Sequence, residues 1–71
     1  MQRLGEKIRT LRKRRKMTLK ELAGELGFSS HTYLIAIEQG KKQPSLELLV
    51  KIARLFDVSF DRLLNDDLEL D

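Results

Sequence analysis

The sequence predicts an all-α domain of five short helices. Apolar residues recur at intervals of three and four positions, which is the spacing of amphipathic helices. Val, Ile and Thr never gather in a run that alternates apolar and polar residues, so strands are not expected. A chain of 71 residues builds one domain at most. We place that domain at residues 1–65 and assign residues 66–71 to an acidic, frayed C-terminal tail.

The first helix is expected at about residues 2–15, with Leu4, Ile8 and Leu11 as its inward stripe. Its C-terminal end carries five successive cations, residues 12–16. These side chains point to all sides of a helix, and cations are favoured at a helix C-terminus regardless of function. We therefore assign to this run a collective, long-range attraction for polyanions.

The second helix has capping signals at both ends. Thr18 and Glu21 have the spacing of a capping box, and Gly27 supplies the left-handed residue that commonly ends a helix. A third helix follows after a short turn, with Ser29 or Ser30 as its N-cap and Gly40 at its end. Two short helices joined by a turn that contains glycine have the outline of a helix-turn-helix motif, a common DNA-binding unit.

The predicted third helix has two distinct faces. Tyr33, Leu34 and Ile37 face inward. The outward face carries no charge and consists of His31, Thr32, Ile35, Ala36 and Gln39. Such a face fits the DNA major groove, where Thr and Gln hydrogen-bond base edges and Ala, Ile and the Thr methyl group contact thymine methyls. The alternative interpretation is an ordinary, half-exposed helix without a ligand.

Ser45 is expected to cap a fourth helix that ends near Phe56, and Ser59 a short fifth helix. The fourth helix is apolar over more than half of its circumference. Its two apolar stripes are Leu46, Leu49, Ala53 and Phe56, and Leu48, Ile52 and Leu55. This surplus predicts either extra core residues or a two-fold interface between copies of the chain. The candidate interface consists of Leu48, Ile52, Leu55, Phe60 and Leu64.

Charge is unevenly distributed along the chain, although the net charge is only +3. Residues 1–20 contain nine Lys or Arg residues and one acidic residue, whereas residues 21–71 contain five Lys or Arg residues and ten acidic ones. A basic end on a small domain indicates a polyanionic partner, and the alternative interpretation is an ordinary solvated face. Nucleic acid is favoured over a membrane, because no large amphipathic apolar face accompanies the charge.

Composition argues against several classes of protein. The chain has no Cys and a single His, so neither a disulfide scaffold nor a Cys/His zinc site is expected, and we predict no metal or other cofactor. His31 has no nucleophile or carboxylate partner at a catalytic spacing, which argues against an enzyme. No apolar run approaches the roughly 20 residues that a membrane span needs, and no targeting stretch follows Met1. We therefore expect a cytoplasmic protein that does not engage a membrane.

The segment from Thr18 to Gly40 resembles a known family. It reads TLKELAGELGFSSHTYLIAIEQG and is followed by Pro44-Ser45, Ile52-Ala53 and Val58-Ser59. The combination of Glu-Leu-Ala, Ile-Glu-x-Gly and Pro-Ser at these offsets is similar to the phage-repressor and Cro-like helix-turn-helix family, over about residues 3–64. The resemblance implies a lambda-repressor-like fold, a third helix that reads the major groove, and usually a homodimer on a two-fold operator. Leu19 departs from the family pattern, because it replaces a Gln that commonly meets a phosphate.

The resemblance, together with the chemistry of the third helix, assigns roles to individual residues. The residues expected to read bases are His31, Thr32, Ile35 and Ala36. The residues expected to bind phosphates are Thr18, Lys20, Ser30, Gln39, Lys41, Lys42 and Gln43. Arg12 is expected to form an ion pair with Glu38, which would lock the first helix to the third.

The leading hypothesis is a sequence-specific transcriptional regulator, expected to be a repressor, that binds double-stranded DNA as a homodimer. It would be a nucleoid-associated protein in a prokaryotic or phage context. The alternative is an antitoxin-like or adaptor module that uses the same fold to bind a protein partner. The apolar surplus on the fourth helix and the uncharged face of the third helix support this alternative.

Overall fold

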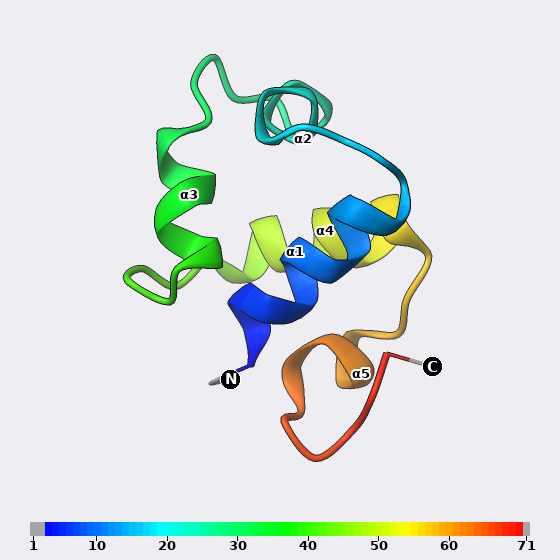
Figure 1. The fold of residues 1–71 in the computed structure, drawn as a ribbon. Helices are drawn as coiled ribbons and strands as arrows, with labels where there is room; N and C mark the ends of the chain where they lie inside the picture. The colour runs from blue at the N-terminus through cyan, green and yellow to red at the C-terminus, as the bar shows by residue number, and fades with distance from the viewer. Residues whose placement is uncertain (1–2, 71) are drawn as a thin grey trace.

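The computed structural model describes residues 3–70, and this part of the chain consists of five helices without a strand (Figure 1). The helices are α1 (Leu4–Arg14), α2 (Leu19–Glu25), α3 (Thr32–Glu38), α4 (Leu46–Phe56) and α5 (Phe60–Leu64). The predicted all-α class and the order of the elements are confirmed. Residue 2, where the first helix was expected to begin, and Asp71, the last residue of the predicted tail, lie outside the described residues. None of the five helices is long and apolar enough to cross a membrane.

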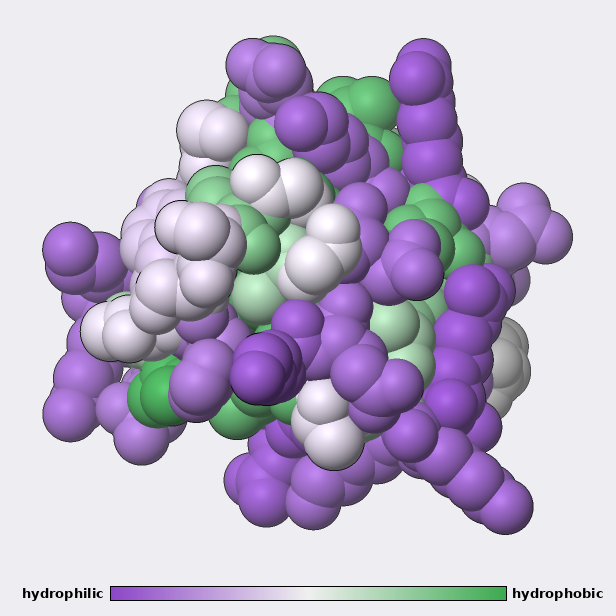
Figure 2. Space-filling view, turned by 90° about the horizontal axis from the view of Figure 1, so that it is seen from above, coloured by the Kyte–Doolittle hydropathy of each residue, from purple (hydrophilic) through white to green (hydrophobic). Residues whose placement is uncertain are grey.

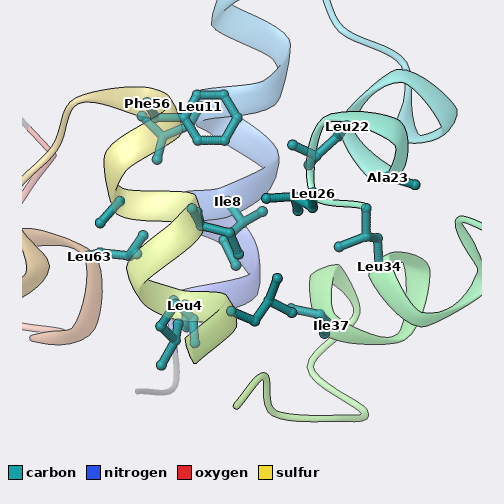
Figure 3. Close-up of a cluster of buried hydrophobic side chains, with 14 residues drawn as sticks. Leu4, Ile8, Leu11, Leu22, Ala23, Leu26, Leu34, Ile37, Phe56 and Leu63 are labelled. Atoms are coloured by element: carbon teal, nitrogen blue, oxygen red, sulfur yellow. The ribbon is translucent and has the colours of Figure 1, made fainter. Parts of the chain in front are cut away.

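One apolar core joins the five helices (Figure 3). The predicted inward stripe of α1 is confirmed, because Leu4, Ile8 and Leu11 are all buried. The other buried apolar residues are Leu22, Ala23, Leu26, Leu34, Ile37, Leu48, Leu49, Ile52, Ala53, Phe56 and Leu63. Burying one large apolar side chain contributes about 1.5–3 kcal/mol, so this cluster is the main favourable contribution to folding.

The predicted caps of α2, α4 and α5 are confirmed. Thr18 Oγ1 accepts a hydrogen bond from Glu21 N–H at 3.1 Å, and the Glu21 carboxylate accepts one from Thr18 N–H at 2.9 Å. The hydrogen bond that the Thr18 backbone N–H donates to the Glu21 carboxylate is the main reason why the pKa of Glu21 lies below its usual range, and a hydrogen bond with the Thr18 side chain is the second. Ser45 Oγ and Ser59 Oγ each accept from the N–H three residues ahead, at 3.2 and 3.1 Å.

The start of α3 differs from the prediction. We expected Ser29 or Ser30 as the N-cap, but α3 begins at Thr32, and its N-cap, His31, makes no side-chain capping bond. Ser30 Oγ instead accepts from Thr32 N–H at 3.2 Å and lies 3.0 Å from Thr32 Oγ1. A serine that binds the N–H two residues ahead forms a local turn rather than a helix cap. Gly27 ends α2 as predicted, with a φ of 87°.

Which apolar residues of α4 and α5 are buried was predicted only in part. Leu48 is 5% exposed and Ile52 is 0% exposed, so both fill the monomer core and their assignment to a two-fold interface is wrong. Conversely, Leu46 belongs to a stripe that also supplies core residues, yet it is 67% exposed. The remaining interface candidates lie at the edge of the core, with Leu55 and Leu64 half-buried and Phe60 exposed.

The acidic tail does not fray over residues 66–70, which corrects another prediction. Arg3 ties the tail to the start of α1: its N–H donates to Asp66 Oδ1 at 3.0 Å, and its guanidinium binds the Glu69 carboxylate through two bonds of 3.1 Å. The side-chain hydrogen bond from Arg3 also holds the pKa of Glu69 below its usual range. The tail therefore packs back onto the folded domain.

Lys7 belongs to the basic end of the sequence, but its side chain is buried. The residue is 1% exposed, and its Nζ donates to the carbonyl oxygens of Arg62, Asn65 and Leu68, each at 2.7 Å. An ammonium group has three donors, and these carbonyls satisfy all of them. Lys7 thus joins α1 to α5 and the tail, and it adds nothing to the exposed positive charge.

The helices α1 and α3 approach each other closely at Gly5. A Cβ atom at this position would overlap the carbonyl oxygens of Ile37 and Glu38 in α3. Only glycine permits this approach of the two backbones. The contact sets the position of α3 on the domain.

Candidate nucleic-acid interface

The outward face of α3 is accessible to solvent because the opposite face is packed into the core. Leu34 and Ile37 are 0% and 1% exposed, and α3 packs against both α1 and α2. On the opposite side Thr32 is exposed, and Ile35 and Ala36 are half-buried. These three positions share one side of a helix. Figure 2 shows pale, neutral side chains on the side of the molecule where α3 lies, among strongly hydrophilic ones.

A shallow hollow of about 390 Å³ brings together the two predicted kinds of DNA contact. It is lined by Phe28, Ser29, Ser30, Thr32, Tyr33, Ala36 and Lys42. Thr32 and Ala36 are predicted to read bases, whereas Ser30 and Lys42 are predicted to bind phosphates. The fold therefore gathers residues from the turn, from α3 and from the loop after α3 at one surface. His31, the remaining polar candidate for base reading, is exposed in the turn that precedes α3.

The loop after α3 is tied to the helix through its backbone. Gly40 turns the chain with a φ of 77°, and the N–H groups of Lys41 and Lys42 then donate to the Ala36 carbonyl at 2.8 and 3.3 Å. This leaves the side chains of the loop pointing outward. The predicted phosphate ligands of this segment are all exposed: Gln39, Lys41, Lys42 and Gln43.

Sequence reasoning missed a role for Tyr33, which it placed only on the inward face. The Tyr33 ring lies edge-on to Phe28, with ring centroids 5.8 Å apart and planes at 80°. Its hydroxyl donates to the Gln43 carbonyl at 3.1 Å. Tyr33 therefore connects the turn before α3 with the loop after it. The signal in the sequence is a tyrosine on an apolar face, because such a hydroxyl usually finds a partner.

The start of α2 supplies a third group of candidates. Thr18 and Lys20 are exposed, as contact with a phosphate requires. Thr18 Oγ1 accepts from Glu21 N–H, so the capping box fixes this side chain at the start of α2. Leu19 is half-buried against the core, so packing takes the place of the polar contact that the family pattern has here.

The predicted pair of Arg12 and Glu38 is confirmed. Arg12 Nε donates to Glu38 Oε2 at 2.8 Å and Nη2 to Oε1 at 3.2 Å, while Nη1 donates to the Met17 carbonyl at 2.8 Å. The two side chains are only 11% and 7% exposed. The pair is therefore buried rather than a surface pair, and it joins α1, the segment before α2, and the C-terminal end of α3.

Comparisons with known proteins agree with this geometry. The chain matches the helix-turn-helix family profile of the Cro/C1 type over residues 8–63. It is 41% identical over 59 residues to the uncharacterised helix-turn-helix-type transcriptional regulator YobD of Bacillus subtilis (strain 168), covering 83% of this chain and 52% of YobD. It is 38% identical over 62 residues to the cryptic phage CTXphi transcriptional repressor RstR of Vibrio cholerae, covering 87% of this chain and 55% of RstR. The chain spans about half the length of these two relatives.

Solved structures extend the comparison to the fold. SinR, a master regulator for biofilm formation, has been solved in complex with DNA; it superposes with a TM-score of 0.77 at 35% identity, covering 87% of this chain and 98% of that one. A complex of SinR with the SinI protein gives a TM-score of 0.81 at 34% identity, covering 90% of this chain and 62% of that one. The family and these relatives are transcriptional regulators rather than enzymes. The five-helix fold and the match over most of its length show that this chain belongs to the Cro/C1-type helix-turn-helix family.

Proposed function

We propose that this protein regulates transcription by binding duplex DNA sequence-specifically, with α3 in the major groove. The observation that carries the proposal is the uncharged outward face of α3, flanked by exposed Lys, Ser and Thr residues at the start of α2 and in the loops around α3. Base edges require neutral hydrogen-bonding and methyl-contact groups, whereas the phosphates beside the groove require cations and N–H or O–H donors.

The base-reading residues divide into two kinds. His31 and Thr32 lie at the N-terminal end of α3 and offer hydrogen-bonding groups. The N-terminal residues of a recognition helix are those that commonly reach base edges. Ile35 and Ala36 follow one turn later and offer methyl groups suited to thymine. We assign sequence preference to these four residues.

Phosphate binding is assigned to two groups of residues on either side of α3. The first group, at and before the helix starts, consists of Thr18, Lys20 and Ser30. The second, at the end of α3 and in its following loop, consists of Gln39, Lys41, Lys42 and Gln43. Contacts on both sides of the groove would set the register of α3 on the duplex without reading its sequence.

We further propose that the protein acts as a homodimeric repressor on a two-fold operator. The helix α3 has seven residues and reaches only a few base pairs. Two copies spaced by one turn of DNA, about 34 Å, double the contacts and give a palindromic site. The relative RstR is a transcriptional repressor, which supports the assigned direction of regulation.

Binding to a duplex recovered by selection from genomic fragments, compared with a random duplex, tests the proposal. Neutralising roughly five to nine phosphates per dimer predicts a slope of about −4 to −8 for log affinity against log salt. The selected duplex should be bound at least about 10³-fold more tightly than the random one. Affinity that is independent of salt, or equal for the two duplexes, would exclude the proposal.

A second candidate function, a protein-binding module of the antitoxin or adaptor kind, is favoured by the exposed apolar side chain of Leu46 on α4. SinR also assembles with a protein, SinI, in one of the solved complexes. A dedicated adaptor is expected to show little affinity for random duplex DNA at low salt. Ile35→Ser distinguishes the two functions further, because loss of a protein partner with unaltered operator preference would assign the face of α3 to protein binding.

A further inference from the structure

Two hydroxyl groups lie side by side at the start of α3. Ser30 Oγ accepts a hydrogen bond from Thr32 N–H at 3.2 Å and lies 3.0 Å from Thr32 Oγ1, where either hydroxyl is free to act as the donor. Both residues are exposed, and both line the hollow that Lys42 also lines. The proposed function assigns Ser30 to a phosphate and Thr32 to a base edge. This hydrogen bond therefore joins two groups that have different ligands.

The direction of the hydrogen bond between the two hydroxyls decides what Thr32 offers to a base. A hydroxyl has one hydrogen to donate and two lone pairs that accept. If Ser30 donates to Thr32, the Thr32 hydrogen is left for an oxygen or a ring nitrogen of a base. If Thr32 donates to Ser30, Thr32 Oγ1 has only lone pairs left, and it accepts from an exocyclic amino group. A threonine without such a neighbour contacts either kind of group.

A phosphate at Ser30 selects one of the two directions. Phosphate oxygens receive hydrogen bonds from the protein, so a phosphate takes the single hydrogen of the Ser30 hydroxyl. The lone pairs of Ser30 Oγ then receive the N–H and the hydroxyl hydrogen of Thr32, the two groups that already lie within hydrogen-bond distance. The exposed Lys42 supplies the positive charge that attracts a phosphate to this hollow. Thr32 is thereby left as an acceptor.

We propose that Ser30 is a positioning residue that makes Thr32 a hydrogen-bond acceptor only, so that α3 selects a base with an exocyclic amino group at this position. In the major groove these bases are adenine, through N6, and cytosine, through N4, whereas thymine and guanine present oxygen acceptors. The inference rests on the proposed reading of DNA by α3, and it specifies the chemical class of one base. It also links a phosphate contact, which by itself carries no sequence information, to the reading of sequence.

Deletion of single amino groups from the selected duplex tests the role of Thr32. Thr32→Val keeps the shape of the side chain without its hydroxyl, so the base pair at which preference changes is the one that Thr32 reads. Replacing adenine there by unsubstituted purine, or cytosine by 2-pyrimidinone, removes only the exocyclic amino group. The replacement should weaken binding by the unaltered chain about three- to tenfold, and binding by Thr32→Val less than about twofold. Equal losses for the two proteins would overturn the inference.

Substitutions of the neighbouring serines test the role of Ser30. Inverting the base pair that Thr32 reads exchanges its amino group for an oxygen, which should weaken binding by the unaltered chain about tenfold. Ser30→Ala frees the Thr32 hydroxyl to donate, so the same inversion should cost it less than about threefold. Ser30→Thr retains the hydroxyl and should retain the tenfold preference. The matched control Ser29→Ala changes an exposed serine of the same hollow and should also retain it.

The ratio of affinities for the two orientations separates positioning from a structural role. If Ser30 only shaped the start of α3, Ser30→Ala would weaken binding to both orientations by one factor, and the unchanged ratio would overturn the inference. The inference and the proposed function also fail in different ways. Equal affinity for selected and random duplexes excludes the proposed function, and the inference with it. Specific binding that is unaffected by deletion of the amino group makes the inference alone wrong, and DNA reading by α3 stands.

Discussion

Cationic side chains have different partners in two regions of the molecule. One region is the end formed by the start of α1, α5 and the tail, and the other is the face formed by α3 and its following loop. At the first, Lys7 and Arg3 are bonded to carbonyl oxygens and carboxylates of the same chain. At the second, the hydrogen bonds that Lys41 and Lys42 make within residues 3–70 come from their backbone N–H groups, and their side chains are exposed.

The difference shows that the number of cations in a segment of sequence does not predict which surface binds a polyanion. The first 20 residues carry most of the positive charge, yet Lys7 is buried, Arg12 is largely buried, and Arg3 is paired with Glu69 at the surface. A cation attracts an external phosphate only when the chain itself has not neutralised or buried it. The comparison therefore predicts that Lys7 affects stability, whereas the lysines of the loop after α3 affect DNA affinity.

The largest expected effect is that of Lys7→Met, which leaves three carbonyl oxygens without their donor. We expect the free energy of unfolding, measured by urea denaturation, to fall by about 3 kcal/mol. Lys41→Met, an equal change on the α3 side, should alter it by less than about 0.5 kcal/mol. Similar losses of unfolding free energy for both variants would contradict the proposed difference between the two regions.

Substitutions on the face of α3 should change which operator is preferred. Thr32→Ala removes a hydrogen-bonding group and Ala36→Gln adds one, so each should shift binding by about 1–3 kcal/mol at a matched base pair. Competition between operators that differ at single positions measures the shift. The effect on stability should be small, since Thr32 is exposed and its hydroxyl contacts only the exposed Ser30 Oγ, and since Ala36 is not part of the buried core. Uniform weakening on every operator would contradict a base-reading role.

Lys41→Ala and Lys42→Ala should weaken binding to selected and random duplexes by similar factors. Each change removes one phosphate contact, so the slope of log affinity against log salt should become shallower by about one unit. Titrations at several salt concentrations provide the measurement, and Lys51→Ala, an exposed lysine on α4, serves as the control. A changed base preference with an unaltered slope would assign these lysines to the wrong class of contact.

Tyr33→Phe should also weaken binding to selected and random duplexes alike, but by a smaller factor. The substitution keeps the ring against Phe28 but removes the hydrogen bond to the Gln43 carbonyl. One such bond is worth about 0.5–1.5 kcal/mol, and its loss should loosen the loop that holds Lys41 and Lys42. Affinity for all duplexes should fall by up to about tenfold, with base preference retained. Unchanged affinity would show that the loop keeps its position without this bond.

The smallest expected effect is the pH dependence of the tail contact. The hydrogen bond from Arg3 lowers the pKa of Glu69 from its usual 4.5, so the ionised carboxylate stabilises the folded chain. This stabilisation is present above the usual pKa and is lost as pH falls through the lowered one. Between about pH 5 and about pH 3, the unfolding temperature of Glu69→Gln should therefore fall slightly less than that of the unaltered chain. Equal slopes would show that the exposed pair contributes nothing.

Local features could be predicted from sequence because they depend on residues three or four positions apart. The capping box of Thr18 and Glu21, the serine caps of α4 and α5, and the glycines that end α2 and α3 are of this kind. The two faces of α3 follow from helical spacing for the same reason. The partner of Arg12, 26 residues away, came from the family resemblance and not from spacing. The start of α3 was misplaced, because two adjacent serines offered equivalent caps.

The sequence by itself determined the five helices, the caps of α2, α4 and α5, and the uncharged face of α3, since hydrogen bonds within a turn and helical periodicity are local. Only the tertiary structure decided which apolar side chains of α4 are buried: Ile52 meets the core, whereas Leu46 on the same helix is left in solvent. It likewise decided that Lys7 is enclosed by carbonyl oxygens 55 to 61 residues away and that the acidic tail is bound to Arg3. Burial and long-range pairing depend on the elements that pack around a residue, and no spacing within one helix specifies them.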